Sequence, residues 1–212
     1  MKPKPLKTDK ITTLFLDIGG VLLTNGWDHN SREKAIKQFK LDGAEVNERH
    51  HLTFDTYESG KITLDEYLNR VIFYDKRKFS RDDFRKFMFS ESKLLENGDA
   101  LEFFIELKEK HNLKIIAVSN EGRELNEYRV EKYKLNKLFH AFVSSCYVHF
   151  RKPDIDIYKV ACDISHTRPD QALCIDDRYM FIQVAHTIGI KGLHYKGLEE
   201  AKEQLKKIKF NR

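Results

Sequence analysis

The residues best suited to chemistry in this chain are acidic side chains that directly follow short apolar runs. Asp17 comes after the run Thr12–Leu16, and Asp176 and Asp177 come at the end of the run around Leu173–Ile175. Two adjacent carboxylates packed against a buried strand repel each other unless a cation offsets their charge. Carboxylates bind Mg²⁺ and can also act as nucleophiles. The three acids therefore predict a carboxylate nucleophile, able to attack phosphorus, beside a magnesium site.

Three further polar residues could contribute to the same site. Ser119 and Asn120 end another apolar run, and Lys152 stands before Pro153 and a helical pattern. Each alone is also typical of turns, helix caps or ordinary surface positions. Together they supply a hydroxyl and an ammonium group that would hold the oxygens of a transferring phosphoryl group. Gly20 would let the backbone approach the same oxygens closely.

The elements that must position these residues are short apolar runs followed by helical patterns. The runs are Thr12–Leu16, Lys114–Ser119, Ala141–Ser145, Leu173–Ile175 with its flanks, and Ile190–Tyr195. Helical patterns occupy Leu101–Lys108, Asp154–Ile164 and Phe181–Ile188. Buried strands that alternate with helices predict an α/β fold, with a parallel sheet covered on both faces. Ligands bind beyond the carboxyl ends of such strands, which is where the polar residues fall.

Residues 24–95 interrupt this alternation, although a crossover between parallel strands needs only a dozen or so residues. Helix start signals occur within the segment at Ser31, Thr63 and Ser80, and a capping box is expected at Thr63. The segment therefore predicts a small helical insertion after the first strand. We expect a core of residues 1–23 and 96–212, with an inserted helical cap of residues 24–95.

Composition excludes several classes of function. The net charge is +5, but Lys and Arg alternate with Asp and Glu, so no nucleic-acid surface is predicted. The three cysteines show no metal or disulfide spacing. Residues 1–10 are polar and lysine-rich, without the apolar core of a signal peptide, and no run reaches membrane-spanning length. We expect a cytoplasmic protein without a membrane partner, and nothing in the sequence indicates an oligomeric state.

The order and spacing of four segments resemble the haloacid dehalogenase superfamily of hydrolases. The segments are LFLDIGGVLL, IIAVSN, RKPDIDIYKVA and CIDD. A fifth, SGKITLDEYL, resembles the cap of the branch that holds small sugar-phosphate phosphatases and the amino-terminal domain of soluble epoxide hydrolase. The resemblance covers about Ile11 to Tyr195. It implies a Rossmann-like core with a helical cap over the site.

The resemblance also implies roles for the residues that match its motifs. Asp17 matches the nucleophile, which would form an aspartyl-phosphate and be regenerated by water. Ser119 would donate a hydrogen bond to the phosphate, with Asn120 beside it. Lys152 would bridge the nucleophile and the phosphate. Trp27 lies where the family has a mobile hairpin, and it would either contact substrate or pack against the cap.

For the metal, the resemblance implies Mg²⁺ bound by Asp177. Asp176 would be a further ligand or would contact the residues that bind the metal. The sequence departs from the family at Gly19, where a second aspartate usually serves as general acid and base. The Gly19 carbonyl is kept, so a site formed by Asp17, that carbonyl and Asp177 can survive. A general acid contributes about 10²–10⁴-fold in rate, so its loss weakens an enzyme without abolishing it.

Three functions remain open from the sequence. The first is a magnesium-dependent phosphatase that hydrolyses a small phosphorylated metabolite, for example a sugar phosphate. The second is a weak or inactive binding or regulatory protein with the same fold. The third is a metal-independent 2-haloacid dehalogenase, although that group typically has tyrosine at the position of Gly19. His29, His50 and His51 are candidates for cap-side contacts or a substitute acid, or are exposed residues without a role.

Overall fold

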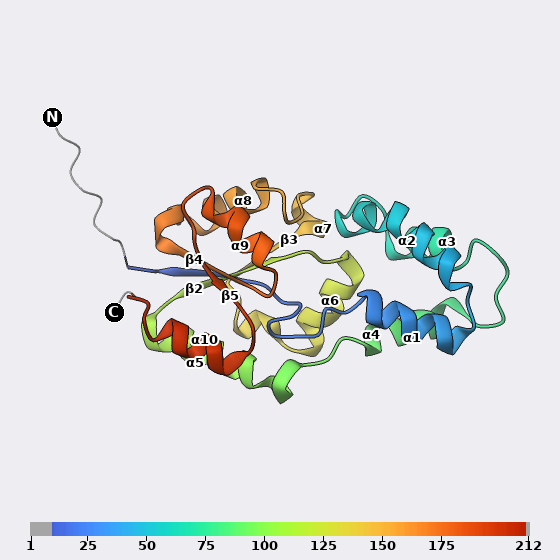
Figure 1. The fold of residues 1–212 in the computed structure, drawn as a ribbon, viewed down its shortest axis with the longest axis horizontal. Helices are drawn as coiled ribbons and strands as arrows, with labels where there is room; N and C mark the ends of the chain where they lie inside the picture. The colour runs from blue at the N-terminus through green and yellow to red at the C-terminus, as the bar shows by residue number, and fades with distance from the viewer. Residues whose placement is uncertain (1–9, 211–212) are drawn as a thin grey trace.

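The centre of the molecule is a five-stranded parallel sheet (Figure 1). The computed structural model describes residues 10–210, apart from the side chains of residues 96 and 97. The strands are β1 (Thr13–Leu16), β2 (Lys114–Ser119), β3 (Ala141–Ser144), β4 (Ala172–Asp176) and β5 (Lys191–His194), in the spatial order β3-β2-β1-β4-β5. The five predicted runs are thus confirmed as strands. Residues 1–9, which include most of the lysine-rich start and the first part of the predicted core segment 1–23, lie outside this description.

Helices cover both faces of the sheet, as predicted. They are α5 (Asp99–His111), α6 (Arg123–Lys132), α7 (Ser145–Val148), α8 (Asp156–Ser165), α9 (Tyr179–His186) and α10 (Leu198–Leu205), with short 3₁₀ helices η1 (Leu95–Gly98), η2 (Leu135–Lys137) and η3 (Pro169–Gln171). In Figure 1, α8 and α9 lie on one side of the strands, and α5 and α10 on the other. The sequence did not predict α6, α7 or α10.

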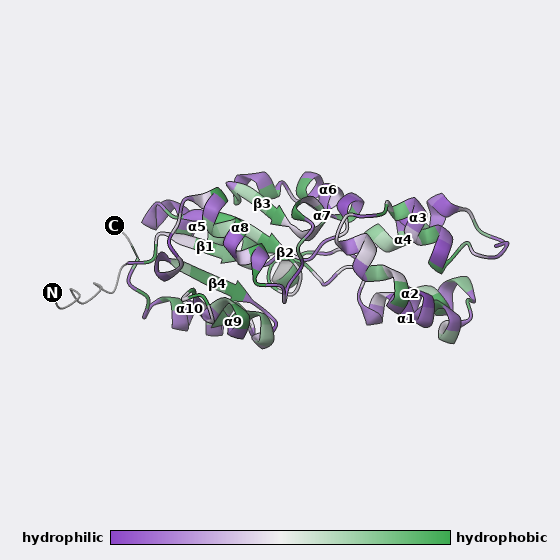
Figure 2. Ribbon diagram, turned by 90° about the horizontal axis from the view of Figure 1, so that it is seen from above, coloured by the Kyte–Doolittle hydropathy of each residue, from purple (hydrophilic) through white to green (hydrophobic). Residues whose placement is uncertain are grey.

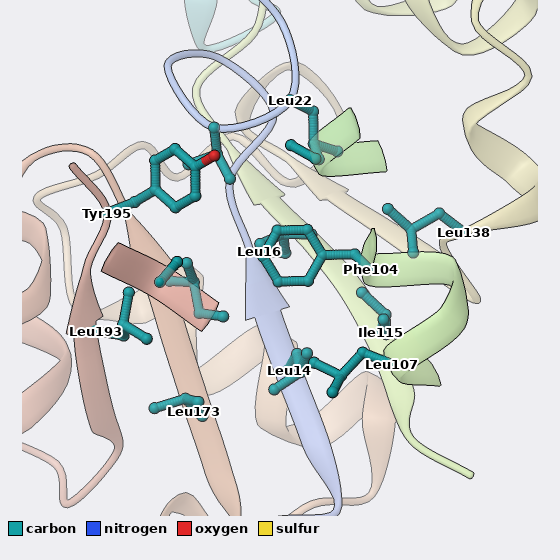
Figure 3. Packing of buried hydrophobic residues seen from close by; sticks show 14 of the residues in the cluster. Leu14, Leu16, Leu22, Phe104, Leu107, Ile115, Leu138, Leu173, Leu193 and Tyr195 are labelled. Atoms are coloured by element: carbon teal, nitrogen blue, oxygen red, sulfur yellow. The ribbon is translucent and has the colours of Figure 1, made fainter. Parts of the chain in front are cut away.

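The alternation of side chains along β1 explains why both faces are apolar. Leu14 and Leu16 pack against Phe104 of α5 on one face (Figure 3), whereas Phe15 faces the cluster formed by α8 and α9 on the other. Successive residues of a strand point to opposite faces, so a strand buried on both faces is a continuous apolar run. Figure 2 shows the apolar residues gathered along the strands and the polar ones on the outer helix faces.

Between β1 and β2 the chain forms a separate group of helices beyond one end of the sheet (Figures 1 and 2). These are α1 (His29–Phe39), α2 (Gly43–Glu58), α3 (Leu64–Val71) and α4 (Arg81–Ser90). The group has its own apolar cluster, in which Trp27 packs edge-on against Phe84 with ring centroids 5.6 Å apart. The helical insertion is therefore present, while the exact cap bounds 24–95 stay a prediction.

The helix starts of the insertion follow from local hydrogen bonds. Thr63 with Glu66, and Ser80 with Asp83, form the capping boxes of α3 and α4. The predicted start at Ser31 is wrong. The Asp28 side chain instead accepts a hydrogen bond from the Ser31 amide, and the Ser31 hydroxyl donates to the Gly26 carbonyl. An aspartate three residues earlier therefore caps α1.

The two chain segments that connect the insertion to the core lie side by side. Leu23 and Leu94 form an antiparallel bridge, the Thr24 amide donates to the Lys93 carbonyl at 2.9 Å, and the Leu95 amide donates to the Leu22 carbonyl at 3.0 Å. The insertion thus leaves and re-enters the core at one place. Within residues 10–210, no helix combines the length and apolar character needed to cross a membrane.

Candidate active site

A cavity of about 280 Å³ lies between the ends of the strands and the helical insertion. From the core it is lined by Asp17, Gly19, Ser119, Asn120, Glu121, Arg129, Arg151, Lys152, Arg178 and Phe181. From the insertion and its first connection it is lined by Asn25, Trp27, Asp28, His29, Arg32, His50, Phe54 and Glu58. Five of the predicted site residues therefore meet in one cavity. Asp176, Asp177 and Gly20 lie beside it, as the contacts below show.

A buried lysine joins two of the predicted acids. The Lys152 Nζ atom lies 2.9 Å from Asp17 Oδ2 and 2.6 Å from Asp176 Oδ2. Burial alone would lower the pKa of Lys152, but the charges of Asp17 and Asp176 outweigh it and raise that pKa above its usual range. Lys152 is therefore a permanent cation at the floor of the cavity.

Backbone contacts fix the Asp17 carboxylate. Asp17 directly follows β1, its amide donates to the Ile175 carbonyl of β4, and its Oδ1 accepts a hydrogen bond from the Ile18 amide at 2.8 Å. Its Oδ2 faces Lys152. Both oxygens are thus held in place before any ligand binds, which is the arrangement that favours nucleophilic attack in one direction.

Asn120 holds the backbone of Lys152. Its Oδ1 accepts from the Lys152 amide at 2.7 Å, and its Nδ2 donates to the Lys152 carbonyl at 2.8 Å. The end of β2 thereby fixes the loop that carries the lysine. These contacts make Asn120 a positioning residue, and its predicted contact with phosphate stays a prediction.

The three acids form a compact group. Carboxylate oxygens of Asp17, Asp176 and Asp177 all lie within 4.8 Å of one another. Asp177 Oδ1 is buried and has no hydrogen-bond partner among the described residues. Burial, and then the charge of Asp17, raise the pKa of both Asp176 and Asp177. An unpaired buried oxygen within a group of hard anionic donors fits a divalent cation such as Mg²⁺.

Two glycines make room for this group. Gly20 has φ +73°, and a Cβ atom there would lie 2.2 Å from Asp177 Oδ2. Position 20 therefore requires glycine because of its backbone conformation and because Asp177 lies so close. The predicted approach of the Gly20 backbone to phosphate stays a prediction. A Cβ atom on Gly19 would lie 2.9 Å from Asn25 Oδ1. The Asn25 side chain also donates a hydrogen bond to Asp177, which lowers that carboxyl's pKa.

Ser119 belongs to a buried network that the sequence did not reveal. Its Oγ atom donates to Glu121 Oε1 at 3.3 Å, and Glu121 forms an ion pair with Arg129 of α6. Arg129 also donates to the Thr24 carbonyl and to Ser92 Oγ, both at 2.9 Å. Burial raises the pKa of Glu121, and the charge of Arg129 opposes this rise. The network connects the serine to both connections of the insertion.

A second ion pair joins the insertion to the loop of Lys152. Arg151 donates to Glu58 Oε2 through Nε, at 2.9 Å, and through Nη2. Burial raises the pKa of Glu58, while Arg151 lowers it. Glu58 is the last residue of α2, and its carbonyl accepts from Ser145 Oγ at 2.7 Å. Helix α2 is thereby fastened over the cavity.

The cap side of the cavity contains a chain of hydrogen bonds. Trp27 Nε1 donates to the Tyr67 hydroxyl at 2.8 Å, and that hydroxyl lies 2.7 Å from His50 Nδ1. Burial, followed by the charge of Arg32, lowers the pKa of His50 to about 3. Trp27 therefore packs in the insertion and also lines the cavity. The lowered pKa favours the neutral form of the His50 ring at ordinary pH, and its role as a cap-side contact or substitute acid stays a prediction.

Comparison with known proteins agrees with this geometry. The family model described as haloacid dehalogenase-like hydrolase matches residues 29–194, a range that holds Ser119, Lys152, Asp176 and Asp177 but begins after Asp17. The search of curated proteins found no match.

Solved structures share the fold. An HAD family enzyme from Bacteroides thetaiotaomicron has a TM-score of 0.79 at 20% identity, over 93% of this chain and 99% of that chain. A structure of that enzyme in complex with magnesium and inorganic phosphate gives 0.74 at 22% identity, over 88% and 94%.

Two further structures show how widely the fold is shared. An HAD-like hydrolase from Porphyromonas gingivalis gives a TM-score of 0.71 at 18% identity, over 94% and 99% of the two chains. An L-2-haloacid dehalogenase gives 0.59 at 15% identity, over 86% and 82%. The family model covers most of the chain and these structures share its fold, so the protein belongs to the haloacid dehalogenase-like hydrolase family.

Proposed function

We propose that this protein is a magnesium-dependent phosphatase that hydrolyses a small phosphorylated metabolite through an intermediate on Asp17. The observation that carries the proposal is the buried group of Asp17, Asp176 and Asp177, with Lys152 bridging two of them and Asp177 Oδ1 unpartnered. This donor set suits a divalent cation and an anionic substrate. The magnesium and phosphate complex of the B. thetaiotaomicron enzyme is consistent with the proposal.

In the first step, an Asp17 oxygen forms a bond to phosphorus while the bond to the leaving oxygen breaks, and the departing alkoxide takes up a proton from water. In the second, water attacks phosphorus, the bond between phosphorus and the Asp17 oxygen breaks, and the proton that water loses passes to solvent, which leaves phosphate and the free Asp17 carboxylate. Ser119 and Lys152 donate hydrogen bonds to the phosphoryl oxygens as negative charge builds up on them. A bound Mg²⁺ would supply the positive charge that lets an anionic phosphoryl group approach the carboxylates.

Phosphate release from aryl phosphates, with Mg²⁺ and with chelator, tests the proposal. We expect release that requires Mg²⁺ and is lost in Asp17→Asn, because an amide oxygen is a poor nucleophile. The matched control is Asp163→Asn, which makes the same change at an exposed acid of α8 outside the cavity. Release by Asp17→Asn at the wild-type rate would overturn the assignment of the nucleophile.

Hydrolytic dehalogenation is the second candidate, because the fold also matches solved dehalogenases. It requires the same nucleophile but no cation. Halide release from a 2-haloacid in the presence of chelator, without phosphate release from aryl phosphates, would favour it. Absence of both activities would leave a binding protein with the same fold.

A further inference from the structure

The cap side of the cavity contains a histidine whose hydrogen bonds assign its tautomer. Tyr67 is fully buried, and its hydroxyl contacts Trp27 Nε1 and His50 Nδ1. The indole N–H can only donate, so the Tyr67 oxygen accepts from it. His50 Nδ1 is then the acceptor available to the Tyr67 proton within the described part of the chain. The ring proton of His50 therefore sits on Nε2.

The ring of His50 is also fixed in place. It packs against Phe54 with ring centroids 4.4 Å apart, and both side chains line the cavity. The Nδ1 edge is occupied by Tyr67, so the edge that remains for a ligand carries the Nε2–H donor. Because the pKa of His50 is lowered to about 3, this donor is uncharged at neutral pH.

Arg32 of α1 lies close enough for its charge to act on His50. Its Nε donates to Asn47 Oδ1 at 3.3 Å and its Nη1 to the Trp27 carbonyl at 3.4 Å. Asp28 and Glu33 stabilise its charge from farther away, but no ion pair within residues 10–210 involves Arg32. Burial lowers its pKa, as expected for a cation withdrawn from water without a carboxylate in contact.

Three other cations of the cavity form ion pairs with carboxylates. Arg129 pairs with Glu121, Arg151 with Glu58, and Lys152 with Asp17 and Asp176. Arg178 acts on the neighbouring Asp177. Arg32 is thus a cation on the cap side without an ion pair among residues 10–210, and it lines the same cavity as His50.

We propose that Arg32 and His50 form an anion-binding subsite for the leaving group, so that preferred substrates are phosphate monoesters carrying a second anionic group. A guanidinium with an adjacent N–H donor matches the oxygens of a carboxylate or a second phosphate. A neutral leaving group would leave Arg32 half-buried and unpaired. This assignment rests on the proposed phosphatase function, because it concerns the substrate of the same site.

The test compares substrates that differ in charge but hardly in shape. The probes are 3-carboxyphenyl phosphate and 3-phosphonophenyl phosphate, with 3-carbamoylphenyl phosphate as the neutral counterpart. We expect kcat/KM to be about tenfold or more higher for at least one anionic probe than for the neutral one, mainly through KM. The two anionic probes distinguish a carboxylate from a phosphate subsite.

Variants of Arg32 and His50 test whether these residues cause the preference for anionic probes. Arg32→Met should bring the ratio of anionic to neutral kcat/KM close to one, and Arg32→Lys should retain part of it because the charge remains without the planar fork. His50→Phe keeps the stacking on Phe54 but removes the donor, and it should lower the ratio. Arg49→Met removes an arginine of the insertion that lies outside the cavity, and it should keep the wild-type ratio.

Two results would overturn the subsite. One is equal kcat/KM for charged and neutral probes in the wild-type protein while magnesium-dependent release persists. The other is a wild-type ratio in an Arg32→Met variant that folds, as checked by thermal unfolding. Absence of release from all three probes would instead contradict the proposed function itself. The wild-type comparison remains decisive even if a variant fails to fold.

Discussion

At the residue scale, the proposed chemistry depends most on the glycine at position 19. No side chain there can protonate a leaving oxygen, and the space where one would begin is taken by Asn25 Oδ1. The same asparagine donates a hydrogen bond to Asp177. The glycine at position 19 therefore leaves room for an asparagine that supports a candidate metal ligand.

The first prediction at this scale concerns the leaving group. Without a side chain at Gly19, the departing alkoxide takes up its proton without a strong acid. We expect kcat/KM to rise steeply with the acidity of the leaving alcohol, so aryl, acyl and anomeric sugar phosphates should react faster than simple alkyl phosphates. A series of substituted phenyl phosphates measures the slope. A flat dependence would mean that another residue acts as the acid.

The second prediction restores the missing acid. Gly19→Asp combined with Asn25→Ala clears the contact that a Cβ atom would make. We expect hydrolysis of alkyl phosphates to rise by about 10²-fold, with a shallower dependence on leaving-group acidity. Asn25→Ala alone serves as the control, because it removes the support of Asp177 without adding an acid. An equal change for aryl and alkyl phosphates would contradict the role assigned to position 19.

At the scale of elements, the site depends on how the end of β2 holds the loop of Lys152. Asn120 makes two hydrogen bonds to the Lys152 backbone. We expect Asn120→Ala to lower the free energy of unfolding by about 1–3 kcal/mol, and to lower kcat because the lysine loses its position. Urea unfolding and phosphate release measure the two effects.

The matched control for this variant is Asn136→Ala, which truncates an exposed asparagine outside the cavity. It should leave both quantities near the wild-type values. Loss of activity in Asn120→Ala through a higher KM alone would favour the predicted contact with phosphate over positioning of Lys152.

The strands could be predicted from the sequence more fully than the helices. The central strands β1, β2 and β4 are buried on both faces over nearly all of their length, so their residues are mostly apolar, and Asp17, Ser119 and Asp176 mark the ends. Helix α2 was missed. It faces both the apolar cluster of the insertion and the polar cavity, so its buried residues include Thr53 and Glu58 and its periodicity is weak. Asp42, which caps it, with Glu45 three residues later, was the available signal.

The same difference explains which site residues could be found. Asp17 and Asp177 directly follow strand ends, and Lys152 stands in the loop just before α8; the parallel sheet brings such positions together. Arg32 and Glu121 reach the cavity only through the packing of α1 and through the pair with Arg129. Charged residues on helices are common, and nothing local distinguishes those that face a cavity.

At the scale of the whole molecule, His50 links stability to pH. Its folded pKa of about 3 lies below the 6.5 of an unperturbed histidine, so between these values the unfolded chain binds more protons. The stabilising contribution is complete above about pH 6.5 and is lost as pH falls toward 3. We expect the wild-type protein to lose about 1 kcal/mol more than His50→Gln between pH 7.5 and 5, after allowance for partial exposure.

Urea unfolding at the two pH values measures this difference. His51→Gln is the matched control, because it makes the same change at an exposed neighbour on the same helix, and it should follow the wild-type pH dependence. Equal pH dependence of the wild-type protein and His50→Gln would show that His50 takes up its proton in the folded state.

The paired connections of the insertion have a consequence for how this architecture can vary. The bridge between Leu23 and Leu94 closes the insertion into a loop at its base, and Arg129 contacts both strands of that base through Thr24 and Ser92. The entropy of closing a loop grows only slowly with its length. A longer or shorter insertion above that base should therefore change the free energy of unfolding of the core only slightly. Substrate preference can then change through the insertion while the carboxylates of the core keep their geometry.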